Sequence, residues 1–246
     1  MKVVIIDQAR MTSTRLPGKV LKTVLGKPLL EYQIERLQRV QSADELVIAT
    51  TTNETDNLIV ELCTRLGVAF YRGSEEDVLA RYYEAAQKYQ ADVVVRVTSD
   101  CPLIDPEIID RIIEDYWQRQ PTCDYVSNCL ERTYPRGMDT EVFSFEALEQ
   151  AYSEAIAIPD REHVTPFIHR QPQRFQIAQV LHWENQSHHR WTVDTKEDFD
   201  LVKKILEFFS FKKLDFTMND CIALLQQYPD WQKINAHVEQ KQDGKS

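Results

Sequence analysis

The stretch "VVIIDQARMTSTRLPGKVL" (residues 3–21) joins a β-branched run to a strongly basic loop. Residues 3–6 predict a short buried strand, because β-branched side chains favour extended backbone. The loop that follows carries Arg10, Arg15 and Lys19. From Arg10 to Leu30 there are five cations and no Asp or Glu, where the average acid content of the chain would place roughly three. The stretch indicates either an anion-binding loop that opens an α/β fold or a solvated basic loop.

The rest of the chain alternates β-branched runs with segments of helical period. This alternation is typical of a doubly wound α/β fold with a mostly parallel, mixed sheet. The nearly continuous apolar run at 93–97 predicts the central strand, because a strand buried on both faces reads as an apolar run. The expected strands are residues 3–6, 46–49, 68–71, 93–97, 123–127, 140–143, 175–180 and 191–193.

Helix boundaries are marked by capping residues. Pro28 suits the first position of one helix. Gly67 suits the left-handed position that ends the next helix, whose apolar side is expected to include Leu58. Asp105, Thr195 and Thr217 are each expected to cap the start of a helix. We expect a main domain at 1–210, with halves at about 1–120 and 121–190, and a C-terminal helical extension at 211–246.

Net charge limits the classes of partner. The 29 basic and 39 acidic residues give a formal charge of −10, which disfavours nucleic acid and anionic membranes. No long apolar segment of a signal peptide or membrane span is recognised, so a cytoplasmic protein is expected. The five cysteines are scattered without a C-x-x-C pair, and neither they nor the histidines have the spacing of a zinc site.

The basic loop differs from the standard phosphate-binding fingerprints. Neither G-x-G-x-x-G nor G-x-x-x-x-G-K-[ST] occurs in the chain, which excludes a typical dinucleotide fold and a P-loop. A loop after the first strand of a doubly wound sheet lies where phosphates usually bind. Here the guanidinium groups of Arg10 and Arg15, together with Lys19, would grip phosphate oxygens, and Gly18 would permit close backbone approach.

Several segments together resemble the CMP-sugar synthetase group, which includes the 3-deoxy-manno-octulosonate and acylneuraminate cytidylyltransferases. The branch named after spore coat polysaccharide biosynthesis protein F is the most similar. The resemblance covers nearly the whole chain. It is carried by Ala9-Arg10, Ser13 to Lys19, Arg72-Gly73-Ser74, Asp77 to Leu79, Arg81, Asp100 to Asp105, Gly137, Asp139, Glu141, Arg161 to Thr165 and Val193 to Thr195.

The resemblance implies a nucleotide-diphospho-sugar transferase-like fold with a smaller second lobe. It implies transfer of CMP from CTP to a sugar or sugar acid, with Mg²⁺ as cofactor and pyrophosphate as product, in surface polysaccharide synthesis. The implied nucleotide-binding residues are Ala9, Arg10, Ser13, Arg15, Lys19, Arg72, Ser74, Arg81 and Asp100; of these, Arg10, Arg15, Lys19 and Asp100 are the predicted catalytic residues. Thr12 and Ser99 replace glycines that are usual in this branch.

Two aspartates are candidates for the metal site. Asp100 and Asp194 each follow a predicted strand directly. Mg²⁺ is typically held by one or two carboxylates together with substrate phosphates. Each aspartate has an alternative structural role, because Asp100 can cap the turn at 99–102 and Asp194 can help to cap the helix after Thr195.

The sugar is expected in the second lobe, where polar clusters follow no structural period. The predicted substrate-binding residues are Arg136, Asp139, Glu141, Arg161 and His163. An acidic sugar would require an arginine fork, for which Arg161 is the first choice, although residues 161–163 can also form a surface helix turn. Asp139 and Glu141 would accept from sugar hydroxyls, hold a second metal or contact only water. Enzymes resembling this chain commonly dimerise through that lobe, so a homodimer is expected, with Phe143, Phe145, Phe167 and Trp183 either forming its surface or belonging to the core.

Two other functions are compatible with the sequence. A glycosyltransferase with a similar nucleotide-binding half would consume a nucleotide sugar, and it would need a D-x-D metal motif. Such a motif occurs here only at Asp198-Phe199-Asp200, inside a predicted helix. A non-catalytic nucleotide-binding regulator is the other alternative.

Overall fold

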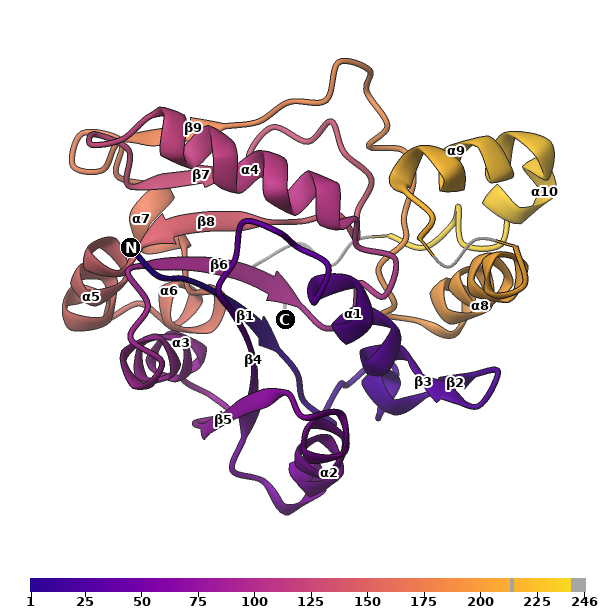
Figure 1. The fold of residues 1–246 in the computed structure, drawn as a ribbon, viewed down its shortest axis with the longest axis horizontal. Helices are drawn as coiled ribbons and strands as arrows, with labels where there is room; N and C mark the ends of the chain where they lie inside the picture. The colour runs from indigo at the N-terminus through magenta and orange to yellow at the C-terminus, as the bar shows by residue number, and fades with distance from the viewer. Residues whose placement is uncertain (213–214, 240–246) are drawn as a thin grey trace.

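A seven-stranded mixed sheet organises the chain. The computed structural model describes residues 1–212 and 215–239, and the sheet has the strand order β5-β4-β1-β6-β8-β7-β9 (Figure 1). The first four of these strands are parallel, and β8 runs antiparallel to β6 and β7. The strands are β1 (Val3–Gln8), β4 (Glu45–Thr51), β5 (Ala69–Gly73), β6 (Val93–Thr98), β7 (Tyr125–Ser127), β8 (Glu141–Ser144) and β9 (Ile177–Gln179).

Helices cover both faces of the sheet. One apolar cluster joins α1, α4, α8 and α9 to one face, and α3, α5 and α7 pack on the other face. The helices are α1 (Leu29–Leu37), α2 (Asn57–Leu66), α3 (Val78–Lys88), α4 (Pro106–Gln118), α5 (Phe145–Glu154), α6 (Ile158–His163), α7 (Pro166–His169), α8 (Lys196–Ser210), α9 (Met218–Gln227) and α10 (Pro229–Gln232). The predicted doubly wound α/β class is confirmed, and β6 is the central strand.

Capping residues set the ends of several helices as predicted. The Asp105 side chain accepts a hydrogen bond from the Glu107 amide at the start of α4. Thr195 and Thr217 each form a capping box at the starts of α8 and α9. Gly67 ends α2 with φ 67°, a left-handed conformation that glycine adopts without steric cost.

Three local predictions are wrong. Pro28 is the N-cap of α1 rather than its first residue, because its ψ of 149° is extended. Leu58 is 50% exposed, since it lies beside the buried stripe of α2 rather than within it. Residues 191–193 form no strand; only an isolated bridge between Arg136 and Arg190 marks this segment.

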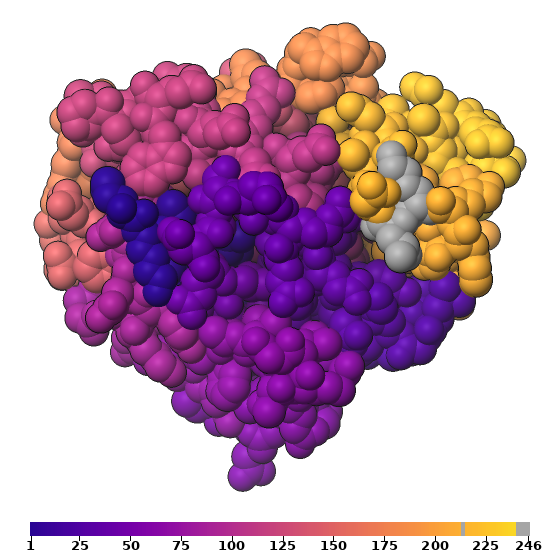
Figure 2. Space-filling view, viewed as in Figure 1, coloured from indigo at the N-terminus to yellow at the C-terminus, as the bar shows by residue number. Residues whose placement is uncertain are grey.

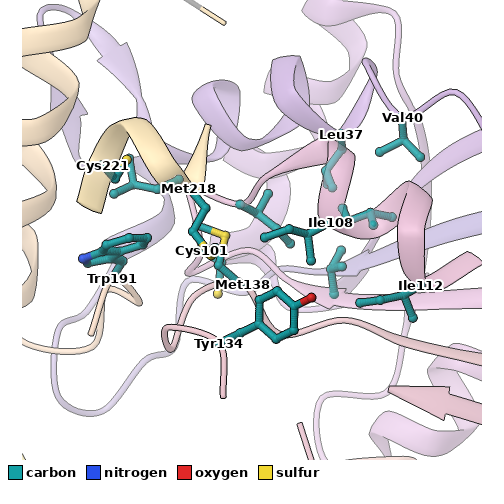
Figure 3. Close-up of a cluster of buried hydrophobic side chains, with 14 of the residues drawn as sticks. Leu37, Val40, Cys101, Ile108, Ile112, Tyr134, Met138, Trp191, Met218 and Cys221 are labelled. Atoms are coloured by element: carbon teal, nitrogen blue, oxygen red, sulfur yellow. The ribbon is translucent and has the colours of Figure 1, made fainter. Parts of the chain in front are cut away.

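The C-terminal helices share the main core. Met218 and Cys221 of α9 pack in the same cluster as Trp191, Met138 and Leu37 (Figure 3). In the space-filling view, the C-terminal helices, in yellow, lie directly against the rest of the molecule (Figure 2). The division predicted near residue 211 therefore separates elements that share one core. Residues 213–214 and 240–246 of the predicted extension lie outside the described residues.

Asp7 is a buried carboxyl in the middle of the sheet. It is fully buried in β1, and neither carboxyl oxygen has a hydrogen-bond partner among the described residues. Burial, and secondly the carboxylate of Asp100, raise the pKa of Asp7 well above its usual value. The folded state therefore favours the protonated acid.

We expect Asp7→Val to stabilise the protein. Removing a buried, unsatisfied polar group is worth about 1–3 kcal/mol, and valine favours a strand. Because the pKa of Asp7 is raised in the folded state, wild-type stability falls as pH rises from the unfolded pKa towards the folded one. The advantage of Asp7→Val should therefore be larger at pH 7 than at pH 4.

Urea unfolding at several pH values measures this difference. Asp7→Asn is the matched control, because it removes the ionisation but keeps the polar atoms. A valine variant less stable than wild type at pH 7 would show that the carboxyl has a stabilising partner.

Candidate active site

The candidate site lies at the carboxyl ends of β1 and β6. These neighbouring parallel strands mark the point where the chain changes direction across the sheet, which is where open α/β sheets bind ligands. A cavity of about 260 Å³ opens there. Its lining includes five of the predicted site residues: Arg10, Ser13, Arg15, Lys19 and Asp100, together with the predicted metal ligand Asp194.

Lys19 joins the two aspartates. Its Nζ donates to Asp100 Oδ2 and to Asp194 Oδ1, both at 2.8 Å. Arg15 Nη2 lies 2.9 Å from Asp194 Oδ2. The Lys19 and Asp194 side chains are each 12% exposed, so this charge cluster is largely shielded from solvent. The basic loop and two carboxylates distant in sequence thus converge on one cavity.

The charges of this cluster hold one another ionised. Burial lowers the pKa of Lys19, but the carboxylates of Asp100 and Asp194 outweigh burial and raise it to about 12. Burial raises the pKa of Asp100, but the Lys19 ammonium, with hydrogen bonds from Lys19 and Thr98, lowers it to about 2. Both groups therefore keep their charge throughout the neutral pH range.

Hydrogen bonds fix the chain at the end of β6. Thr98 Oγ1 donates to Asp100 Oδ1 at 2.6 Å. The Gln33 side chain from α1 donates to the Thr98 carbonyl at 2.8 Å and accepts from the Cys101 amide at 3.0 Å. Ser99, where the resemblance predicts a glycine, donates through Oγ to the Gln8 carbonyl at 2.7 Å. Its side chain thus ties β6 to β1.

Asp194 reaches the cavity from an irregular segment. The Val193 amide donates to the Asp100 carbonyl at 2.7 Å, which places the two aspartates side by side without a strand. Arg190 Nη2 donates to Asp194 Oδ2 at 2.9 Å, and its Nε donates to Asp198 Oδ1 at 2.9 Å. Sequence reasoning did not identify Arg190, because the segment at 190–195 is not helical and a four-residue spacing brings side chains together only within a helix.

The tip of the basic loop is tied to the connection between β5 and α3. Gly18 has φ 66°, and its amide donates to the Met11 carbonyl at 2.9 Å, so the loop closes on itself. Arg10 Nη1 lies 3.3 Å from Glu75 Oε1, and the Thr12 hydroxyl also donates to Glu75. Glu75 was not singled out in the sequence, and Thr12 makes this contact through a side chain that the glycine expected from the resemblance would lack.

The remaining predicted nucleotide-binding residues do not line this cavity. Arg72 donates to the carbonyls of Thr51 and Asn53, both at 2.8 Å. Arg81 is buried and donates to the Ser74 carbonyl. Ala9 is buried, and its amide donates to the Ala49 carbonyl at 3.1 Å. In this structure Arg72 and Arg81 therefore hold neighbouring backbone segments together.

A second cavity of about 410 Å³ adjoins the first. Thr98 lines both cavities. The second one contains three of the five predicted substrate-binding residues, namely Asp139, Glu141 and His163. Glu141 is 6% exposed and accepts hydrogen bonds from Tyr125 and Thr165, both at 2.6 Å, and from Arg96.

Arg161 and Arg136 lie elsewhere. The Arg161 guanidinium is ion-paired with Asp77 and donates to the Tyr152 carbonyl at 2.8 Å, so it joins α6 to α3. Arg136 lines a different cavity, next to the segment at 187–191. Arg132, which sequence reasoning did not identify, contributes the guanidinium group beside Asp139 in the second cavity.

The described part of the chain contains neither an all-protein metal cluster nor a membrane-spanning helix. No group of three or more His, Cys, Asp or Glu side chains gathers there in the manner of an all-protein metal site. Among residues 1–212 and 215–239, no helix has the length and apolar character needed to cross a bilayer.

Comparison with known proteins agrees with the fold. Residues 3–234 match the profile of the cytidylyltransferase family, and the chain belongs to that family. It is 39% identical to an uncharacterised protein of Methanocaldococcus jannaschii, over 98% of this chain and 97% of that protein. It is 32% identical to the spore coat polysaccharide biosynthesis protein SpsF of Bacillus subtilis, over 93% and 95% of the two chains.

A solved structure has the same fold throughout. A cytidylyltransferase from Leptospira borgpetersenii superposes with a TM-score of 0.91 at 33% identity, covering 98% of this chain and 99% of that one. The resemblance to spore coat polysaccharide and CMP-sugar synthetase proteins, and the nucleotidyltransferase activity that the family implies, are thereby confirmed.

Proposed function

We propose that the protein transfers CMP from CTP to a hydroxyl group of a sugar or sugar acid and releases pyrophosphate. The observation that carries this proposal is the convergence of Arg10, Arg15 and Lys19 with Asp100 and Asp194 in one cavity. Cations there suit a triphosphate, and carboxylates suit the divalent ion that accompanies it. Surface polysaccharide synthesis is the proposed setting, by similarity to the Bacillus protein.

The two aspartates fit a magnesium site. Their oxygens already face one cation, the Lys19 ammonium, at 2.8 Å on each side. Two carboxylates are a usual protein contribution to a Mg²⁺ site that substrate phosphates complete. Asp100 and Asp194 would hold Mg²⁺, which would neutralise phosphate charge when bound.

The adjoining cavities suit the two substrates. The nucleotide would bind with its phosphates against the basic loop, and the sugar would bind beside Glu141 and Asp139. Because Thr98 lines both cavities, a sugar hydroxyl there lies near the phosphates for attack on the α-phosphorus. The bond between the α-phosphorus and the oxygen that bridges it to the β-phosphate breaks, and the hydroxyl proton passes to solvent. Lys19 and Arg15 stabilise the departing pyrophosphate. No covalent enzyme intermediate is needed.

Acceptor recognition should depend on Arg132 rather than Arg161. Arg132→Gln is expected to raise the KM for the sugar about tenfold or more, because it alters a charge that faces the cavity. Arg161→Gln should leave that KM within about twofold and instead lower the free energy of unfolding, since its partners are structural. Steady-state kinetics with urea unfolding separates the two, and a reversed pattern would place the sugar near α6.

The proposed homodimer is not explained by all of the predicted aromatic residues. Phe143 is fully buried in the core, whereas Trp183 is 84% exposed. We keep Trp183 as the candidate contact. Sedimentation of wild type and Trp183→Ala tests it, with a monomeric wild type as the contradicting result.

A glycosyltransferase is less compatible with the structure. The Asp198 of the D-x-D motif is buried, belongs to the capping box of α8 and binds Arg190. The Asp198 carboxylate therefore has a structural role and is not positioned to bind the metal of a nucleotide.

Incubation with CTP, Mg²⁺ and a panel of sugars and sugar acids tests the proposal. We expect pyrophosphate release together with a CMP-linked product that mass spectrometry detects. CTP binding without turnover of any acceptor would favour a regulator, and turnover of a preformed nucleotide sugar would favour a glycosyltransferase.

A further inference from the structure

The Lys19 ammonium group lies between the two aspartates that would hold the proposed metal ion. Its Nζ is 2.8 Å from Asp100 Oδ2 and 2.8 Å from Asp194 Oδ1. Mg²⁺ contacts its oxygen ligands at about 2.0–2.1 Å, so an ion that bridges the same two oxygens would crowd the Nζ atom. The two cations would also repel each other strongly, because the site is largely shielded from solvent. The ammonium group and the metal ion therefore compete for one place.

Each of the two carboxylates is held by a second set of partners at its other oxygen. Asp100 Oδ1 accepts a hydrogen bond from the Thr98 hydroxyl at 2.6 Å. Asp194 Oδ2 lies 2.9 Å from the guanidinium groups of both Arg15 and Arg190. These partners keep both carboxylates in position while the cation between them changes. The two aspartates therefore form a preorganised site for one exchangeable cation.

The Lys19 side chain can move while its backbone stays in place. Lys19 begins a short helical turn (Lys19–Leu21). Its amide donates to the Leu16 carbonyl at 3.2 Å, and its carbonyl accepts from the Lys22 amide at 3.1 Å. The four-carbon stem of a lysine is flexible, and Lys19 lines the cavity of the basic loop. Rotation of the stem can therefore carry the ammonium group from the carboxylates to phosphate oxygens in the same cavity.

We propose that the Lys19 ammonium group and the divalent ion exchange places when the nucleotide binds. Without CTP, the ammonium group neutralises the two carboxylates and keeps the metal ion out. The triphosphate draws the ammonium group towards its own oxygens, which leaves Asp100 and Asp194 to the ion that accompanies CTP. The exchange rests on the proposed nucleotide and metal sites, to which it adds a coupling between the two ligands.

The exchange makes the binding of metal and nucleotide cooperative. A metal ion that arrives alone must displace the ammonium group, which then has no phosphate to contact. CTP that arrives alone must draw Lys19 away from two carboxylates, which are then left without their shared cation. When both ligands bind together, neither cost arises. By linkage, each ligand should raise the affinity for the other by the same factor.

Titration with Mn²⁺ in the absence of nucleotide tests the exchange, because the electron paramagnetic resonance signal of free Mn²⁺ measures binding without turnover. We expect wild type to bind Mn²⁺ weakly, and Lys19→Met and Lys19→Gln to bind it at least tenfold more tightly. Adding Asp194→Asn to Lys19→Met should remove this gain. The matched control Lys22→Met, at a residue that does not line the cavity, should bind Mn²⁺ like wild type. Circular dichroism checks that each variant is folded.

A second measurement uses the unchanged chain and so does not depend on the folding of a variant. CTP should raise the Mn²⁺ affinity of wild type at least tenfold, measured by water proton relaxation and corrected for the complex that Mn²⁺ forms with CTP in solution.

Two results would overturn the exchange while leaving the aspartates as a metal site. One is equal Mn²⁺ affinity in wild type and both Lys19 variants, and the other is a wild type that binds Mn²⁺ as tightly without CTP as with it. A gain that survives Asp194→Asn would instead contradict the metal assignment itself. So would a lack of Mn²⁺ binding both to wild type with CTP and to the Lys19 variants, and the exchange would then fail with that assignment.

Discussion

Lys19→Met is expected to lower CTP turnover by about 10²–10³-fold, the usual cost of removing a preorganised group that stabilises charge in the transition state. Lys19 supplies the ammonium that contacts both Asp100 and Asp194 at 2.8 Å. In the proposed reaction, the departing pyrophosphate would then lose a buried cation. Turnover should remain low at saturating CTP, because the loss affects kcat as well as binding.

The same substitution should destabilise the protein without ligands. It leaves two largely buried carboxylates without their shared cation, and breaking a buried ion pair costs about 3–5 kcal/mol. Partial solvent exposure of Asp100, at 20%, places the expected loss near the lower end of that range. Added Mg²⁺ should recover part of the stability, since it replaces the lost positive charge.

Lys22→Met is the matched control. Lys22 lies three residues along the chain, and it does not line the site cavity. It should keep wild-type turnover and stability to within about twofold and 0.5 kcal/mol. Equal losses in both variants would show that the loop acts through general charge rather than through Lys19.

Asp100→Asn and Asp194→Asn should each abolish Mg²⁺-dependent CTP binding and lower turnover by about 10²-fold or more. An amide keeps the shape of the side chain but removes the charge that a divalent ion needs. Asp194→Asn should also destabilise the fold more than Asp100→Asn, because Asp194 contacts Arg15 and Arg190 as well as Lys19.

Asp200→Asn distinguishes this site from a D-x-D site. Asp200 belongs to the D-x-D motif of α8, but it does not line the site cavity. We expect it to retain wild-type turnover and Mg²⁺ dependence, measured by isothermal titration with CTP and by pyrophosphate release. Full activity of both the Asp100 and Asp194 variants would disprove the metal assignment.

Regular elements could be predicted from the sequence because their signals are local. The apolar run of β6, the caps at Asp105 and Thr195, and the glycine after α2 each reflect backbone preferences within a few residues. Asp100 follows directly from such a signal, since it comes two residues after the central strand β6.

Other features depend on contacts between distant segments and could not be predicted locally. Asp194 reaches its place through a hydrogen bond between Val193 and Asp100, where the sequence indicated a strand. Arg161 was expected to face a ligand, yet its guanidinium forms an ion pair with Asp77, 84 residues away. Charge and spacing along the chain do not reveal which carboxylate an arginine will contact.

A crystal structure with CTP and Mn²⁺ tests the central claim most directly, because the anomalous signal of Mn²⁺ locates the metal independently. We expect the Mn²⁺ peak in contact with Asp100 and Asp194, and the triphosphate against Arg10, Arg15 and Lys19. A triphosphate bound at another cavity, or Mn²⁺ far from both aspartates, would contradict it.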